Sequence, residues 1–189
     1  VWVYRRQPDG TWAYNDRFSV KPRPFMGTIG TAPDLEALSS LTPHMHGGNM
    51  DVPDVCAGNT VYLPVNVPGA YFSTGDCHVA QGEGEACGVA LEVSGKVTVR
   101  FGLIKNRPIM WPRIVSPEDI MTIGSARPLE DAARVALAEM VEWLQSEFHY
   151  EKWDAYQLVS QTAKLTIANL VDTYYTVVAK ILRTYTTLI

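Results

Sequence analysis

The chain has 189 residues, of which 47% are hydrophobic and 19% are charged. These proportions are typical of a folded globular protein and exclude extended disorder. The net charge is −4 and the basic residues are scattered, which excludes the basic patch that a nucleic-acid partner would need.

Membrane proteins and disulfide-rich proteins are also excluded. No apolar stretch approaches the roughly 18 residues that suggest a membrane span, so no membrane partner is expected. The three cysteines, Cys56, Cys77 and Cys87, contain no C-x-x-C spacing. A sparse, odd set of this kind favours a reducing compartment over a disulfide framework. We therefore expect a cytoplasmic protein.

The first two thirds of the chain has the pattern of strands and loops. Eleven of the twelve prolines lie before residue 125, between short β-branched runs such as 60–65, as expected of turns that join strands. The clearest predicted hairpin joins residues 88–93 to residues 96–104 through Ser94-Gly95. In its second strand each odd-numbered residue from 97 to 103 is apolar, which predicts one buried face and one wet face.

The last third has helical periodicity. After Gly124 the apolar residues fall on a single stripe, which predicts a helix from Leu129 to Phe148. A second helix is predicted to begin near Asp154, which can cap it, and to end at about Lys164. The β-branched run from Thr176 predicts a final strand.

These elements together predict an α+β fold. Its β-rich body of antiparallel strands and hairpins would occupy residues 1–124 and carry the chemistry. A C-terminal helical pair and the final strand, residues 125–189, would pack on that body.

Two glycine-bracketed segments gather side chains that are capable of chemistry. The first, 46–51, sets His46, Asn49 and Asp51 around a Gly-Gly turn whose N–H groups can face an anion. The second, 75–88, holds polar residues between glycines: Asp76, His78, Gln81, Glu83 and Glu85. Either segment alone is typical of an ordinary turn, and it is their combination that favours a functional site.

The second segment also has an informative spacing. In an extended chain, residues two apart share a face, so Asp76 and His78 would form one pair and Glu83 and Glu85 another. Carboxylates and imidazoles are costly to gather unless a metal or a substrate proton lies between them. This mixture without thiolates suits zinc or another divalent metal, and it equally suits metal-free acid–base chemistry. The spacing leaves both interpretations open.

At this point the chain resembles a known family. The motifs H-G-G-N-M-D at 46–51 and G-D-x-H-x-A-Q-G-x-G-E at 75–85 resemble those of the acetamidase/formamidase family of short-chain amide hydrolases. Three further segments, 24–33, 61–70 and 97–105, resemble the family in the same order. The matching site positions are His46, Asn49, Asp51, Asp76, His78, Gln81, Glu83 and Glu85.

The resemblance implies a small amide substrate of the formamide or acetamide type, hydrolysed to a carboxylic acid and ammonia. It also implies assembly into homo-oligomers and a bound divalent metal, with zinc expected first and calcium or another ion left open. We expect the metal ligands among His46, Asp51, Asp76 and His78. Glu83 or Glu85 would act as the base, and Asn49, Gln81 or the Gly47-Gly48 N–H groups would support the oxyanion. Water activation by the carboxylates without a metal is the competing mechanism.

Members of this family carry a further strand-rich region of a hundred or more residues before the part that this chain resembles. The chain is therefore expected to be a fragment, a processed product, or one subunit of a split amidase whose partner chain carries the N-terminal half. A β-rich binding module without catalytic activity is the alternative from a different class.

Overall fold

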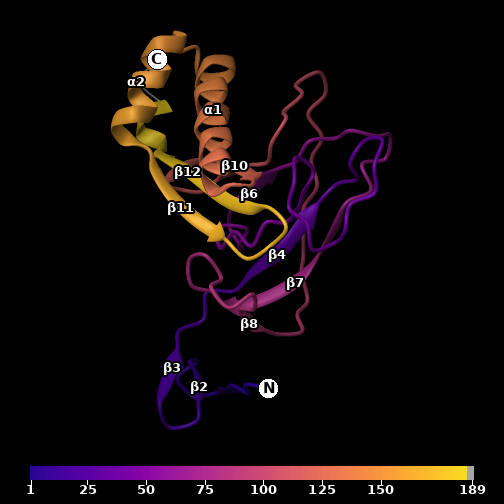
Figure 1. Cartoon of the computed structure of the whole chain (residues 1–189), viewed down its shortest axis with the longest axis vertical. Coiled ribbons are helices and arrows are strands. Elements are labelled where there is room, and N and C mark those ends of the chain that lie inside the picture. The colour runs from indigo at the N-terminus through magenta and orange to yellow at the C-terminus, as the bar shows by residue number, and fades with distance from the viewer. Residues whose placement is uncertain (187–189) are drawn as a thin grey trace.

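The computed structural model describes residues 1–186 and has an α+β fold, as predicted (Figure 1). Two helices, α1 (Leu129–Phe148) and α2 (Lys152–Thr162), precede the last two strands. A short 3₁₀ helix, η1 (Arg183–Thr186), closes the described chain. The strands are β1 (Arg5–Arg6), β2 (Trp12–Tyr14), β3 (Phe18–Val20), β4 (Phe25–Gly30), β5 (Gly47–Asn49), β6 (Thr60–Tyr62), β7 (Ser73–Ala80), β8 (Leu91–Glu92), β9 (Arg113–Val115), β10 (Asp119–Ala126), β11 (Lys164–Asn169) and β12 (Tyr175–Leu182).

The strands form three sheets, in which the pairs within the described residues are antiparallel. A five-stranded sheet has the order β11-β12-β10-β9-β6, and a four-stranded sheet has the order β5-β4-β7-β8. The small sheet β1-β2-β3 lies apart from them, near the marked N-terminus (Figure 1).

The two larger sheets share one hydrophobic core. Ile29 of β4 and Met50 and Val52 after β5 pack with Ile123 of β10 and Val178 of β12. Met50, Val52 and Ile123 have no exposed surface, so these contacts hold the end of β5 firmly against the five-stranded sheet. The polar residues on either side of Met50 are thereby fixed in place.

The helix predicted over 129–148 is confirmed as α1, because its apolar stripe covers β10 and β12. The close approach requires a glycine: a Cβ at Gly124 would lie 2.7 Å from the Ala136 nitrogen. The second helix, α2, ends at Thr162, two residues before its predicted end. The predicted final strand is confirmed as β12, but β11 was not predicted.

The predicted hairpin of residues 88–93 and 96–104 is wrong. Within residues 1–186, β8 pairs with β7 instead, and residues 96–104 belong to no strand. Their odd-numbered apolar side chains are exposed rather than buried; Phe101, for example, is 67% exposed. The alternation predicted a strand with one buried face, but within residues 1–186 this segment forms no strand and covers no core.

The proposed division at residue 124 falls inside β10, and β10 pairs with β12 along eight positions. The two parts thus contribute to one sheet; residues 187–189 of the second part lie outside the described residues. No helix among residues 1–186 is both long and apolar enough to cross a membrane.

Candidate active site

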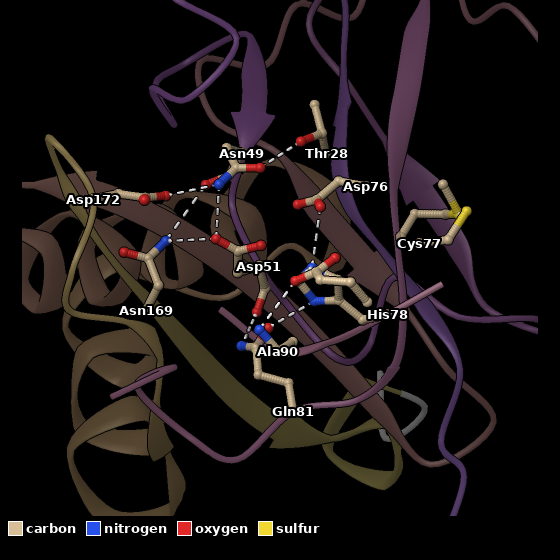
Figure 2. A network of polar contacts seen from close by, with 12 residues as sticks. Thr28, Asn49, Asp51, Asp76, Cys77, His78, Gln81, Ala90, Asn169 and Asp172 are labelled. Carbon is tan, nitrogen blue, oxygen red and sulfur yellow. Dashed lines mark hydrogen bonds and ion pairs between the residues drawn. The ribbon is translucent and has the colours of Figure 1, made fainter. Parts of the chain in front are cut away.

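Five polar residues of the two motifs meet where β5 and β7 flank β4, beside the turn between β11 and β12 (Figure 2): Asn49, Asp51, Asp76, His78 and Gln81. Glycines make this approach possible at β5. A Cβ at Gly48 would lie 2.5 Å from the Thr42 carbonyl oxygen, and both Gly47 and Gly48 have positive φ. The Gly47 N–H donates to the His44 carbonyl, so it is not free to face an anion as the sequence suggested.

Asp51 is the most unusual group of the site because it is fully buried among other carboxyls. Its Oδ2 accepts from Asn49 Nδ2 at 2.9 Å, but its Oδ1 is buried without a hydrogen-bond partner. Burial, together with the nearby Glu85, Asp172 and Asp76, raises the pKa of Asp51 to about 9. A buried acceptor without a donor indicates that a proton or a cation belongs beside it.

The free oxygen of Asp51 opens onto a space that a glycine keeps clear. A Cβ at Gly27 would lie 2.6 Å from Asp51 Oδ1 and closer still to Asp76 Oδ2. Both carboxylate oxygens therefore face the same small volume above β4. Asp76 has 32% of its side chain exposed, so this volume lies near solvent.

His78 has its ring orientation and tautomer fixed by Gln81. Gln81 Nε2 donates to the carbonyls of Asp51 and Ala168, each at 2.9 Å, which leaves Oε1 to accept from His78 Nδ1 at 2.9 Å. The proton of a neutral His78 is therefore on Nδ1, and Nε2 carries the lone pair. The expected Asp76–His78 pair is confirmed, with His78 Nε2 3.2 Å from Asp76 Oδ1.

His78 Nε2 also lies 3.2 Å from Glu92 Oε1, yet it is buried and forms no hydrogen bond with either carboxylate. A lone pair that faces two carboxylates is repelled unless a proton or a cation lies between them. The orphaned atoms Asp51 Oδ1 and His78 Nε2 thus both fit a metal with nitrogen and oxygen ligands.

Glu83 and Glu85 do not form the expected pair, because a turn separates them. Gly84 has a positive φ, its N–H donates to Ile167, and its carbonyl accepts from Leu170. This turn leaves Glu83 exposed and buries Glu85, which remains 7% exposed. Burial raises the pKa of Glu85, whereas His78 and a hydrogen bond with Asp51 lower it.

Two groups of side chains in the described residues have ligand atoms within 4.8 Å of one another. One is Asp51, His78 and Glu85; the other is Asp76, His78 and Glu92. His46 belongs to neither group. It is buried next to Gly30 and Gly48, its Nδ1 has no partner, and burial, aided by His44, lowers its pKa.

Three polar residues of the site were missed in the sequence. Asp172 Oδ2 accepts from Asn49 Nδ2 at 2.9 Å, and burial raises the pKa of Asp172. Asn169 Nδ2 lies 3.4 Å from Asp51 Oδ2, and Glu92 reaches His78 from β8. Asp172 and Asn169 are some 120 residues from Asn49 in sequence and have no local motif, so only the pairing of β11 with β12 brings them here.

Comparison with known proteins identifies the family. The sequence profile described as the Acetamidase/Formamidase family matches residues 26–184. The chain belongs to this family. The matched residues include all the polar side chains of the site, from Asn49 to Asp172, and also Gly27.

Solved structures of the family have the same fold. An acetamidase from Yersinia enterocolitica is 44% identical with a TM-score of 0.92, over 94% of this chain and 54% of its own. An acetamidase from Bacillus halodurans is 33% identical with a TM-score of 0.91, over 96% of this chain and 61% of its own. The formamidase of Methylophilus methylotrophus is 36% identical over 92 residues, which is 43% of this chain and 22% of that protein. This chain therefore spans between one half and two thirds of the length of these solved relatives.

Proposed function

We propose that this chain hydrolyses small linear amides of the formamide or acetamide type to a carboxylate and ammonia. One observation carries the proposal: Asp51 Oδ1 is buried without a partner and shares the space above Gly27 with Asp76, beside the lone pair of His78. Membership of the family supports the substrate class.

We propose a divalent metal as cofactor, with zinc first because imidazole nitrogen and carboxylate oxygen are ligands that it accepts. Asp51 and His78 would hold it, with Asp76 or Glu92 completing the set, so that the nearby Glu85 would remain free to act as a base. His46, which the sequence suggested as a ligand, lies in neither group and is not part of this proposal. Bound there, the metal supplies Lewis acidity that polarises a carbonyl and acidifies water. Calcium, which takes six to eight oxygen ligands, is the alternative to be tested.

Glu85 is proposed as the general base. Its carboxylate takes a proton from water, the water oxygen bonds to the amide carbon, and the same proton passes to nitrogen as the C–N bond breaks. Burial raises the pKa of Glu85, which makes its carboxylate a better proton acceptor than an exposed one. Glu83 remains the second candidate from the sequence, although it is exposed.

Asn49 and Gln81 act as positioning residues in this account. Both N–H bonds of Asn49 Nδ2 are used, by Asp51 and Asp172, and both of Gln81 Nε2 are used, by two backbone carbonyls. Neither amide has a donor left for an oxyanion. In the metal-free alternative a protonated Asp51 would donate to the oxyanion, which its raised pKa allows.

A second candidate is one chain of a split or assembled amidase, either with a partner polypeptide or as a homo-oligomer. The observation that favours it is the share of the solved relatives, 54% and 61%, that this chain covers. The three free cysteines support the cytoplasm as its compartment.

The test is ammonia release from formamide and acetamide by the purified chain, before and after treatment with a chelator. The proposal expects release that chelation abolishes and that zinc restores better than calcium. Release that chelation does not alter would favour the metal-free mechanism. Tight metal binding without any turnover, also in the presence of a complementing chain, would contradict the proposal and favour the binding module.

A further inference from the structure

A strip of apolar side chains runs along the outside of the molecule between β8 and β9. It consists of residues 96–104, which we call the docking segment. Its odd-numbered side chains are well exposed: Val97 41%, Val99 44%, Phe101 67% and Leu103 68%. A contiguous exposed strip of this kind marks an interaction surface in a folded protein.

The docking segment has the sequence of a strand but lacks strand partners. Apolar residues at 97, 99, 101 and 103 alternate with Lys96, Thr98, Arg100 and Gly102, so an extended chain would have one apolar and one polar face. Within residues 1–186 no backbone hydrogen bond of the docking segment is found. Its N–H and C=O groups are therefore available to a neighbouring strand.

The docking segment is nevertheless held at both ends and in the middle. Before it, the Val93 N–H donates to Cys77 of β7 at 3.0 Å, and Gly95 packs closely on Cys77 Sγ. In the middle, the ring of Phe101 meets that of Phe72 edge-on at 4.8 Å. Beyond it, Arg107 forms an ion pair with Glu147 of α1. The segment is thus tethered near β7, at Phe72 and near α1.

The chemistry of the segment restricts its partner. Residues 93–112 contain no acidic residue and four basic ones, namely Lys96, Arg100, Lys105 and Arg107. A complementary strand would have apolar side chains on one face and acidic side chains on the other. A second copy of the same segment would instead bring like charges together, which disfavours pairing between two copies.

The part of the solved acetamidases that this chain does not cover is a candidate partner for the docking segment. The two solved acetamidases superpose on nearly the whole of this chain but have large parts, close to half in one case, without a counterpart here. We propose that the docking segment pairs, by strand addition, with a β-strand from polypeptide equivalent to that uncovered part. This proposal does not depend on the catalytic one.

The test combines the 189-residue chain with the part of the Yersinia enterocolitica acetamidase that it does not cover. Native mass spectrometry should find a 1:1 complex, and hydrogen exchange should slow at the amides of residues 97–104. Val99→Pro, which removes a strand N–H, and Phe101→Asp, which places a charge in the apolar face, should each weaken binding about tenfold or more. Leu35→Asp, at a side chain that is 99% exposed elsewhere, should bind as the wild type does.

Phe101→Asp also removes the ring contact with Phe72, so a melting curve for each variant separates a loss of stability from a loss of binding. Three results would overturn the proposal: no complex, a complex of unchanged affinity in both variants, or protection of residues 97–104 by self-association. The hydrogen-exchange measurement on the unaltered chain stands even where a variant is unstable.

Discussion

Two buried carboxyls, Asp51 and Asp54, lie three residues apart and have opposite surroundings. Asp54 is paired with Lys180 Nζ at 2.5 Å and Arg23 Nη2 at 3.0 Å, so its charge is neutralised within the protein. Asp51 has Glu85, Asp76 and Asp172 as neighbours and no cation. Burial of a carboxyl alone therefore does not indicate function. A buried carboxyl that lacks a basic side chain beside it does, because a proton, a metal or a substrate must neutralise its charge.

Arg113, a buried cation on β9 that faces α1, offers a second comparison. Arg113 is 5% exposed, lies 3.5 Å from Glu139 and stacks over Trp143 at 5.0 Å. Burial raises the pKa of Glu139, while Arg113 lowers it. Here the two opposite charges face each other, although Arg113 Nε has no hydrogen-bond partner, whereas the Asp51 cluster brings carboxyls of like charge together. The predictions below separate the two kinds of buried charge.

The largest expected effect separates the two glutamates of the turn. Glu85→Gln removes the proposed base and should lower kcat by about 10²- to 10⁴-fold. Glu83→Gln, on the exposed side of Gly84, is the matched control and should leave kcat unchanged. Steady-state ammonia release gives both values. Equal losses in the two variants, or none in either, would remove Glu85 from the role of base.

The space above Gly27 can be filled without altering the backbone. Gly27→Ala places a methyl group against Asp51 Oδ1 and Asp76 Oδ2, and displacement by about 1 Å should lower kcat/KM by roughly 10²-fold. Gly75→Ala, whose Cβ would meet no atom within 4 Å, is the control on the neighbouring strand. Full activity of Gly27→Ala would mean that substrate and metal are held elsewhere.

Asp54→Asn should affect stability and leave catalysis intact. It leaves Lys180, only 17% exposed at its side chain, without its counter-charge, and should lower the free energy of unfolding by about 1–3 kcal/mol. Urea unfolding measures this change, and kcat should stay within about twofold of the wild type, since a structural ion pair does not touch the reacting atoms. An Asp54→Asn variant that is stable but inactive would show that Asp54 takes part in the reaction.

A further expected effect is a pH dependence of the stability of the metal-free protein. The pKa of Asp51 rises from 3.8 to about 9 on folding, so the folded state binds more protons between these values. The free energy of unfolding should therefore fall as pH rises through this range. The contribution of Asp51 to it is largest below pH 3.8, the pKa of the unfolded state. The slope should be shallower in Asp51→Asn and unchanged in Asp54→Asn, as measured by unfolding of chelated protein at several pH values.

Local periodicity predicted the elements that depend on a continuous apolar stripe or on contacts between residues close in sequence. The 3.6-residue stripe predicted α1. The pair of Asp76 and His78 was also predicted, although Asp76 has a positive φ of 60° and not the extended backbone that the prediction assumed. Asp172 could not be predicted because its position depends on the pairing of β11 with β12. Residues 96–104 show the opposite error, a strand that was predicted but is not formed. Alternation indicates that a segment can form a strand, but not whether a neighbouring strand is present to pair with it.

The central claim is that Asp51 serves the reaction and Asp54 serves the fold. Ammonia release from formamide by wild type, Asp51→Asn and Asp54→Asn, assayed in parallel with thermal melting, tests it most directly. We predict that Asp51→Asn loses at least about 10³-fold in kcat/KM while melting at or above the wild-type temperature. Asp54→Asn should instead melt below the wild-type temperature and keep its activity. An Asp51→Asn variant that turns over at the wild-type rate would contradict the account.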